Sequence, residues 1–295
     1  MSPRGTVAHR VVLEQDAWTP LASAHEARVD ALLEAHRGRR SRGVKHPIED
    51  FVFEYYSYRP SSLRRWHPGW GVELGGDVAR FSGVRGFTVA AGTAHVDPGL
   101  PGRRRAEVAR TLAILEATKG RPPSLGCFGL HEWAMVYRLA PGAARHPLPL
   151  RLGAEGTDTV VEQHRIACTH FDAFRFFSPD AVARNALIPT AEKRQRNEQP
   201  GCLHANMDVY KWAYKLTPFT SAELVADCFE LARRIRVLDM RASPYDLSEL
   251  GYSAVAIETA AGKAEYLAAQ RAFAAEAAVL RNRLIELCQD VLGSL

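Results

Sequence analysis

Residues 220–240, TSAELVADCFELARRIRVLDM, decide the fold class of this chain. Apolar side chains recur in this stretch every three or four residues, which is the period of an α-helix that buries one face. The spacing of Thr220 and Glu223 is that of a capping box, so we expect the helix to begin at Thr220. The apolar stripe then comprises Leu224, Cys228, Leu231, Ile235 and Leu238. A helix with so continuous a buried face predicts a helical core.

The same period extends to other parts of the chain. A long helix is predicted near the C-terminus, and Pro47, with acidic residues directly after it, is placed as the first residue of another helix. Weaker helical patterns cover residues 20–37, 104–118, 129–138 and 204–215. Two segments rich in Val, Thr and small residues, 84–96 and 252–259, predict short strands.

These elements predict a mostly α (α+β) fold, in which a helical domain carries a minor sheet of short strands. We expect one globular domain over residues 1–295. It would have an N-terminal helix and basic loop at about 1–45 and a long C-terminal helix at about 262–292.

Composition restricts the class of protein. The chain of 295 residues is 46% hydrophobic and carries a formal charge of +5, which is typical of globular proteins. No apolar run approaches the roughly 20 residues needed to cross a bilayer, and no leader-like segment begins the chain. Its five cysteines form no CxxC pair. We therefore expect a cytoplasmic protein with reduced thiols and no membrane partner.

Three short segments combine a cysteine, a histidine and an acidic residue. They contain Cys127, His131 and Glu132; Cys168, His170 and Asp172; and Cys202, His204 and Asp208. Thiols, imidazoles and carboxylates transfer protons, attack carbon or bind metals near neutral pH. The histidines and acids are therefore the candidate catalytic residues, and the cysteines are either functional or part of the core.

A metal site is one interpretation of these segments. His131, His170 and His204, together with Glu132, Asp172 or Asp208, would suit Fe or Zn. A set of two histidines and one carboxylate leaves open positions at which a metal can activate oxygen. The spacing matches none of the standard short metal motifs, so this interpretation depends on the ligand types alone.

On a helix over residues 202–215, His204, Asp208 and Lys211 would lie on one stripe. Asp208 could then orient His204 or pair with Lys211, and the alternative is a salt-bridge ladder on a solvated face. The stretch from Cys168 to Phe177 alternates polar and aromatic residues. This alternation predicts an extended segment with His170 and Asp172 on one face.

Cations and aromatic rings alternate just after residue 54. Such a pattern is typical of a surface that binds phosphates and stacks on rings, although a core helix that ends in a basic loop has the same composition. The candidate substrate-binding or DNA-binding residues are Tyr55, Tyr56, Arg59, Arg64, Arg65, Trp133, Tyr210 and Lys211. Further basic runs occur at residues 37–45 and 103–105.

Several strings resemble those of actinobacterial proteins of the 3-methyladenine DNA glycosylase family. They are HPIEDF (46–51), YYSYRP (55–60), GCFGLHEWAMVYR (126–138), EQPGCLHANMD (198–208) and DMRASPYDL (239–247). The resemblance covers nearly the whole chain. It implies a DNA-repair N-glycosylase that hydrolyses the glycosidic bond of an alkylated purine after base flipping.

Three functions remain open. In a glycosylase, Asp172 or Asp208 would stabilise the positive charge that develops on the sugar, the aromatic candidates would stack on the base, and the Arg runs at 37–42 and 64–65 would hold DNA phosphates. The alternative is a metal-dependent (Fe or Zn) or acid/base enzyme that acts on a small molecule in a helical pocket lined by His and Asp. The third possibility is a binding protein without catalytic activity, in which these groups only form hydrogen bonds inside the core.

Overall fold

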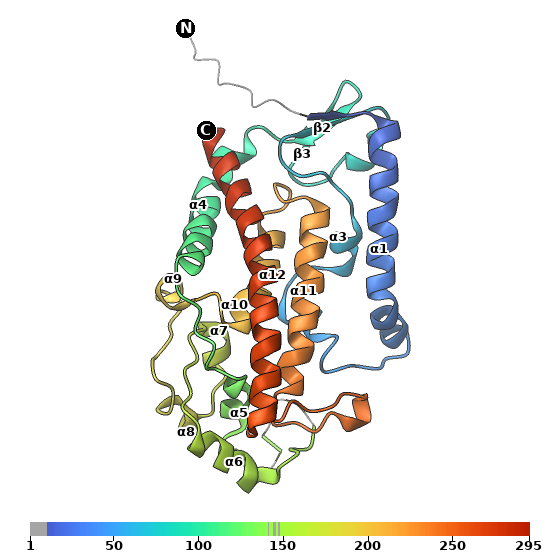
Figure 1. Cartoon of the computed structure of the whole chain (residues 1–295). Coiled ribbons are helices and arrows are strands. Elements are labelled where there is room, and N and C mark those ends of the chain that lie inside the picture. The colour runs from blue at the N-terminus through green and yellow to red at the C-terminus, as the bar shows by residue number, and fades with distance from the viewer. Residues whose placement is uncertain (1–10, 141, 144–145, 147) are drawn as a thin grey trace.

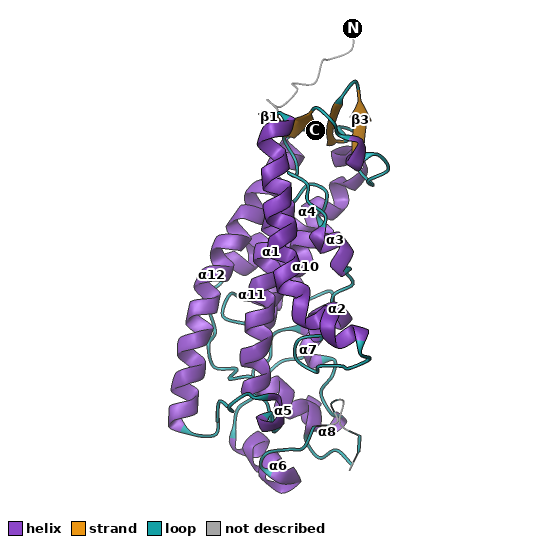
Figure 2. Cartoon of the chain, turned by 90° about the vertical axis from the view of Figure 1, so that its right-hand side faces the viewer, coloured by secondary structure: helices purple, strands orange, loops and turns teal. Residues whose placement is uncertain are grey.

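The computed structural model describes residues 11–140, 142–143, 146 and 148–295, so the first ten residues of the predicted N-terminal segment lie outside it. The predicted fold class is confirmed: most of the described chain is helical, and a small four-stranded sheet accompanies the helices. Figures 1 and 2 show an elongated body of long helices with the sheet at one end and α6 (Gly153–Gln163) and α8 (Pro179–Val182) at the other.

Four helices form the centre of the molecule. α10 (Leu203–Lys215) packs against α11 (Ala222–Arg241) and α12 (Ala260–Gly293), and α12 also packs along α4 (Leu100–Lys119). Every residue of α10 from Leu203 to Tyr214 is buried, because helices and loops cover it on all sides. α10 is therefore where polar side chains can meet away from water.

The predicted stripe of α11 is buried, but the helix begins one residue later than its capping box predicts. Ser221 is the N-cap, and its hydroxyl accepts a hydrogen bond from the Leu224 amide at 3.3 Å. Glu223 accepts a hydrogen bond from the indole of Trp66 instead of returning to the backbone. Thr220 is fully buried just before the helix. The capping box was wrong because the indole takes the carboxylate that the motif requires.

The sheet has the strand order β1-β2-β4-β3. β1 (Val11–Leu13) runs parallel to β2 (Val72–Gly75), whereas β4 (Thr93–Val96) is antiparallel to both β2 and β3 (Phe87–Ala90). The strands predicted in residues 84–96 are therefore confirmed as the hairpin β3–β4. Ala91 and Gly92 connect them, both with positive φ, as a tight two-residue hairpin turn requires.

α1 (Gln15–Ser41) is longer than predicted and packs along α3 (Pro60–Arg64) and α11. One apolar cluster extends from Val29 in α1 to Val291 in α12. The remaining short helices are α2 (Phe51–Tyr55), α5 (Leu130–Val136), α7 (Phe171–Phe174), α9 (Arg194–Asn197) and the 3₁₀ turns Ala79–Phe81 and Ser248–Leu250.

Two local predictions are wrong. The helix expected from Pro47 begins only at Phe51, because the Asp50 carboxylate accepts from the His46 amide and holds residues 47–50 in a turn. The strand expected at 252–259 is irregular, since Val255 donates its amide to the carbonyl of Arg241 at the end of α11. That segment thus closes a helix end and pairs with no strand.

None of the described helices combines the length and the hydropathy that crossing a lipid bilayer requires.

Candidate functional site

Three histidine rings from separate parts of the sequence meet in the core. His131 lies on α5, His204 lies in the first turn of α10, and His170 is the residue just before α7. The ring centroid of His204 is 4.5 Å from that of His131 and 5.3 Å from that of His170. All three rings are buried. The structure therefore gathers the imidazoles of all three Cys–His segments.

The first group, called the His131 group, consists of His131, His204 and Asp239. Each of these residues offers one ligand atom, and these atoms lie within 4.8 Å of one another. His131 Nε2 is 2.9 Å from Asp239 Oδ1. The three residues come from α5, α10 and α11, so the packing of three helices fixes the geometry of the group.

Arg236 fixes the carboxylate of this group from the other side. It precedes Asp239 by one turn of α11 and donates Nη1 to Asp239 Oδ2 at 2.9 Å and to Glu132 Oε1 at 2.7 Å. Glu132 therefore pairs with the buried Arg236, whereas its neighbour His131 contacts Asp239. The two side chains have different partners because adjacent residues on a helix point about 100° apart. Asp239 Oδ1 faces His131 Nε2 and has no other partner among the described residues.

Charges set the protonation of the His131 group. Burial disfavours the charge on His131, but Asp239 and Cys127 outweigh burial and hold the pKa of His131 well above its ordinary value. Burial also disfavours the charge on Asp239, yet His131 keeps the pKa of that carboxyl well below its usual range. Burial and the neighbouring His131 lower the pKa of His204 to about 3, so this ring is neutral at pH 7. A neutral imidazole and a carboxylate are the forms that bind metals.

A small hollow of about 10 Å³ adjoins these two imidazoles, roughly the room that one water molecule needs. Burial raises the pKa of the thiols of Cys168 and Cys202, so both are protonated at pH 7. Cys127 Sγ lies 3.9 Å from His131 Nδ1. The side chains that line the hollow include His131, His204, Cys127, Cys168, Cys202, Thr169, Gln199, Tyr266 and Gln270. The three cysteines therefore face one hollow.

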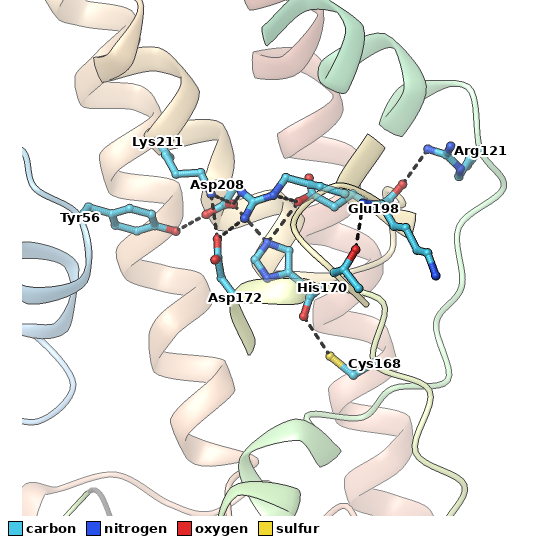
Figure 3. Close-up of polar contacts among 11 residues, drawn as sticks. Tyr56, Arg121, Cys168, His170, Asp172, Glu198, Asp208 and Lys211 are labelled. Carbon is cyan, nitrogen blue, oxygen red and sulfur yellow. Dashed lines mark hydrogen bonds and ion pairs between the residues drawn. The ribbon is translucent and has the colours of Figure 1, made fainter. Parts of the chain in front are cut away.

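The second group, called the His170 group, consists of His170, Glu198 and Asp208 (Figure 3). His170 Nε2 lies 3.1 Å from Asp208 Oδ2 and 3.5 Å from Glu198 Oε1. Tyr56 donates its hydroxyl to Asp208 Oδ1 at 3.0 Å. Asp208 thus orients His170 and not His204, whereas the alternative prediction, that Asp208 pairs with Lys211 within α10, is confirmed.

Two cations neutralise the carboxylates of the His170 group. Lys211 pairs with Asp208 and lies 3.3 Å from Asp172, and Arg194 lies 2.8 Å from Asp172 and 3.4 Å from Glu198. Burial opposes ionisation of Asp172 and Asp208, but the neighbouring cations together outweigh burial and hold the pKa of each below its ordinary value: Lys211 and Arg194 for Asp172, and Lys211 and His170 for Asp208. Burial raises the pKa of Glu198. This group is therefore a nearly balanced buried salt-bridge network.

Asp172 reaches this network from a helix and not from the predicted extended segment. The chain is irregular up to His170 and turns into α7 at Phe171, so Asp172 lies in the first turn of that helix. The prediction was wrong because the backbone turns at His170, whose carbonyl accepts from the Phe174 amide at 3.0 Å, and this turn directs Phe174 and Phe177 into the core. Phe174 and Phe177 belong to the main core.

Backbone geometry places the histidines. Phe128 and Gly129 both have positive φ, and this left-handed turn starts α5 immediately before His131. A Cβ atom on Gly201 would lie 2.5 Å from the carbonyl oxygen of Ser124, so only glycine allows the two segments to approach. Gln270 of α12 donates to the Gly201 carbonyl at 2.6 Å and holds the start of α10.

The aromatic candidates do not form a surface. Trp133 and Tyr210 are fully buried, and the Trp133 indole donates to the Ala242 carbonyl at 2.8 Å. Tyr56 is buried against Asp208, and burial holds the pKa of Tyr55 far above its ordinary value. Trp133 and Tyr210 therefore have no exposed face for stacking. Tyr56 packs in the core, as the core interpretation of the segment after residue 54 predicts.

The basic candidate residues do not lie together at one site. Arg64 pairs with Asp30 at 2.9 Å and Glu26 at 3.1 Å on α1, whereas Arg65 also lines a second pocket together with Lys215. Arg59 is the N-cap of α3, and the structure gives its side chain no contact with either histidine group. Lys211 is the one cationic candidate that the structure brings into the site.

Four functional candidates were missed in the sequence: Asp239, Arg236, Glu198 and Arg194. A signal existed for two of them. Arg236 and Asp239 are charged residues three apart, next to the apolar stripe of α11, and such a pair is buried only when it has partners. Arg194 and Glu198 are charged residues four apart, but no apolar stripe beside them indicates burial, because they come from the short helix α9 and the turn after it.

Comparisons of this chain with protein-family models, with curated proteins and with solved structures find no match.

Proposed function

We propose that this protein is a metal-dependent enzyme that acts on a small molecule, and that His131, His204 and Asp239 bind its metal ion. The observation that carries the proposal is the convergence of two imidazoles and one carboxylate, all buried, within 4.8 Å. Two atoms bound to one ion at about 2.1 Å lie roughly 3.0 to 3.4 Å apart. The 2.9 Å between His131 Nε2 and Asp239 Oδ1 is close to this spacing.

The surroundings of the His131 group support the proposal. Arg236 binds Oδ2 of Asp239, as outer partners do for carboxylates that ligate metals, while Oδ1 faces His131 Nε2 at 2.9 Å. His204 is a neutral ring whose nitrogens have no hydrogen bond among the described residues. A metal ion would replace the proton that His131 shares with Asp239.

The number of ligands indicates the chemistry. Three protein ligands leave at least one position for water or substrate, as in catalytic zinc sites and in Fe(II) sites with two histidines and one carboxylate. The adjoining hollow is about 10 Å³, which favours a small reacting group at that position. A bound Fe or Zn ion supplies Lewis-acid or redox chemistry there.

The His170 group is a less suitable metal site. Lys211 and Arg194 already neutralise its carboxylates, and a divalent cation would have to approach both of them. Asp208 also accepts hydrogen bonds from Tyr56 and His170, so its oxygens are occupied. We infer that this group positions His204 through the contact between the His170 and His204 rings.

Metal titration tests the proposal. Protein expressed without a polyhistidine tag is stripped of metal and titrated with Fe(II), under anaerobic conditions, and with Zn(II). We expect about one ion per chain. His204→Ala and Asp239→Asn should weaken binding at least tenfold, since each removes a ligand. The buried His25, which bonds to the Leu63 carbonyl, provides the matched control His25→Gln with unchanged binding.

Two results would overturn the assignment. One is a wild-type protein that binds neither ion with stoichiometric occupancy. The other is an ion that persists in His204→Ala and is lost in His170→Ala, which would move the site to the His170 group.

A DNA glycosylase remains the second candidate. The observation that favours it is the arrangement of the ionised Asp172 and Asp208 beside Tyr55 and Tyr56, because a glycosylase needs a carboxylate and rings near the sugar and base. Release of 3-methyladenine from alkylated duplex DNA tests it. The glycosylase predicts release that Asp172→Asn abolishes and that chelators leave unchanged, whereas the metal enzyme predicts no release.

A further inference from the structure

A basic pocket lies apart from both histidine groups. Its volume is about 650 Å³, within the roughly 300 to 1,000 Å³ usual for small-molecule sites. It reaches Lys215, the last residue of α10, whereas His204 is the second residue of that helix. At 1.5 Å per residue, their backbones are about 16 Å apart. The pocket is therefore a separate site.

Cations from distant parts of the sequence surround this pocket. Arg65 follows α3, Arg85 precedes β3, Arg103 and Arg104 lie in the first turns of α4, and Lys215 ends α10. The only carboxylate among the lining residues is Glu107. Arg65 from the basic run at 64–65 and Arg103 and Arg104 from the run at 103–105 thus meet around one hollow.

Two of these cations are already paired with carboxylates and are not free to bind a ligand. Arg104 pairs with Glu107 at 2.9 Å and donates to the Thr217 carbonyl at 2.6 Å, and Arg103 pairs with Asp97 at 2.6 Å. Arg65, Arg85 and Lys215 are exposed, and no ion pair is found for them within the described ranges. Three positive charges around one concave site attract an anion.

A buried polar group also lines the pocket. His67 is 6% exposed, and its Nδ1 has no hydrogen-bond partner in the described part of the chain. A buried ring nitrogen without a partner is costly, and it is usually retained where a ligand or water can satisfy the ring. This second observation also points to a ligand in the pocket.

We propose that this pocket binds a small organic phosphate, with the phosphate held by Arg65, Arg85 and Lys215. Arginine side chains bind phosphate oxygens in pairs, and lysine contributes a point charge. Val84, Leu100 and Pro218 form an apolar wall that suits the organic part of the ligand. A hollow of about 650 Å³ fits one small molecule better than an extended nucleic-acid backbone.

Calorimetric titration with inorganic pyrophosphate at low salt tests this proposal. We expect saturable binding to the wild-type protein, weakened about tenfold or more in the double variant Arg65→Gln/Arg85→Gln. Both arginines are exposed, so the variant should fold, and circular dichroism checks this. Arg105→Gln is the matched control. Arg105 is an exposed member of the α4 run that does not line the pocket, so its loss should leave binding unchanged.

Absence of pyrophosphate binding, or equal binding by the double variant, would overturn the proposal. A short DNA duplex is titrated in parallel. If the duplex binds through Arg65 and Arg85 more tightly than pyrophosphate does, the small-ligand assignment is overturned and the pocket belongs to a DNA-binding face. Neither outcome depends on the metal site, because the probe and the substituted residues are different.

Discussion

The rings of His170 and His204 stack at an interplanar angle of 27°, with their centroids 5.3 Å apart. This contact joins the two histidine groups, since His204 belongs to the His131 group and His170 is fixed by Asp208. Rotation of His204 would break the stack. The salt-bridge network around Asp208 therefore fixes the orientation of a candidate metal ligand that has no hydrogen bond of its own among the described residues.

Arg236→Met should destabilise the fold and weaken metal binding. The substitution leaves Glu132 and Asp239 buried without their shared cation, which costs about 3 to 5 kcal/mol in the free energy of unfolding. Loss of the partner that orients Asp239 should also weaken metal affinity about 10- to 100-fold. Urea unfolding and metal titration measure the two effects. Arg234→Met removes an exposed pair with Glu276 and should change stability by at most about 1 kcal/mol.

Lys211→Met should lower the free energy of unfolding by about 3 kcal/mol, because it leaves Asp172 and Asp208 facing each other without their shared ammonium. The exposed Lys215, one turn further along α10, supplies the control. Lys215→Met should stay within about 0.5 kcal/mol of the wild type. Equal stabilities of the two variants in urea would contradict the buried network described for Asp208.

His67 should make stability depend on pH. Burial lowers its pKa from 6.5 to about 4, so between these values the unfolded chain binds the proton more readily than the folded chain does. The contribution of His67 to the free energy of unfolding is highest above pH 6.5, where the ring is neutral in both the folded and the unfolded chain. It decreases as the pH falls towards 4, because only the unfolded chain then binds the proton. Between pH 7 and pH 5 the loss amounts to about 2 kcal/mol.

Urea unfolding in phosphate-free buffer at the two pH values measures this loss. His67→Phe should remove about 2 kcal/mol of the difference, since phenylalanine does not titrate. Arg110→Gln, an exposed substitution on α4, should keep the wild-type difference. An unchanged difference in His67→Phe would show that other groups cause the pH dependence.

Ser221→Ala should cost about 1 kcal/mol, because the hydroxyl of Ser221 caps the first turn of α11. The exposed Ser61 on α3 makes no cap, so Ser61→Ala should cost less than about 0.5 kcal/mol. Thermal unfolding of the two variants compares them. A larger loss in Ser61→Ala would contradict the assignment of the N-cap.

The long helices could be predicted because each buries a stripe with a period that the sequence displays directly. α11 and α12 were located to within a few residues, and the hairpin β3–β4 was found from its composition. β1 and β2 were missed, since Val11–Leu13 and Val72–Gly75 are only three and four residues long and form strands through pairing with distant parts of the chain. Residues 252–259 have strand composition but no strand to pair with.

The candidate site was visible only in part. The sequence indicates His131, His170 and His204 as site residues because each follows a cysteine within four residues. Their carboxylate partners depend on how helices pack, which local spacing does not contain: Asp239 reaches His131 from α11, and Asp208 turns towards His170. The spacing of residues within one helix identifies which side chains are neighbours along that helix. A buried site is formed by side chains from several helices, so this spacing does not identify its members.

The position of α12, which follows all three histidines in the sequence, has a consequence for synthesis. Gln270 and Tyr266 of α12 line the hollow beside His131, and Arg281 of the same helix donates to Asn206 in α10 at 2.7 Å. A nascent chain on the ribosome can carry all three histidines while α12 is still inside the exit tunnel. The enclosed site therefore forms only once α12 has left the tunnel, and a ribosome-bound intermediate without α12 exposes Cys127, Cys168, Cys202 and the three imidazoles to solvent.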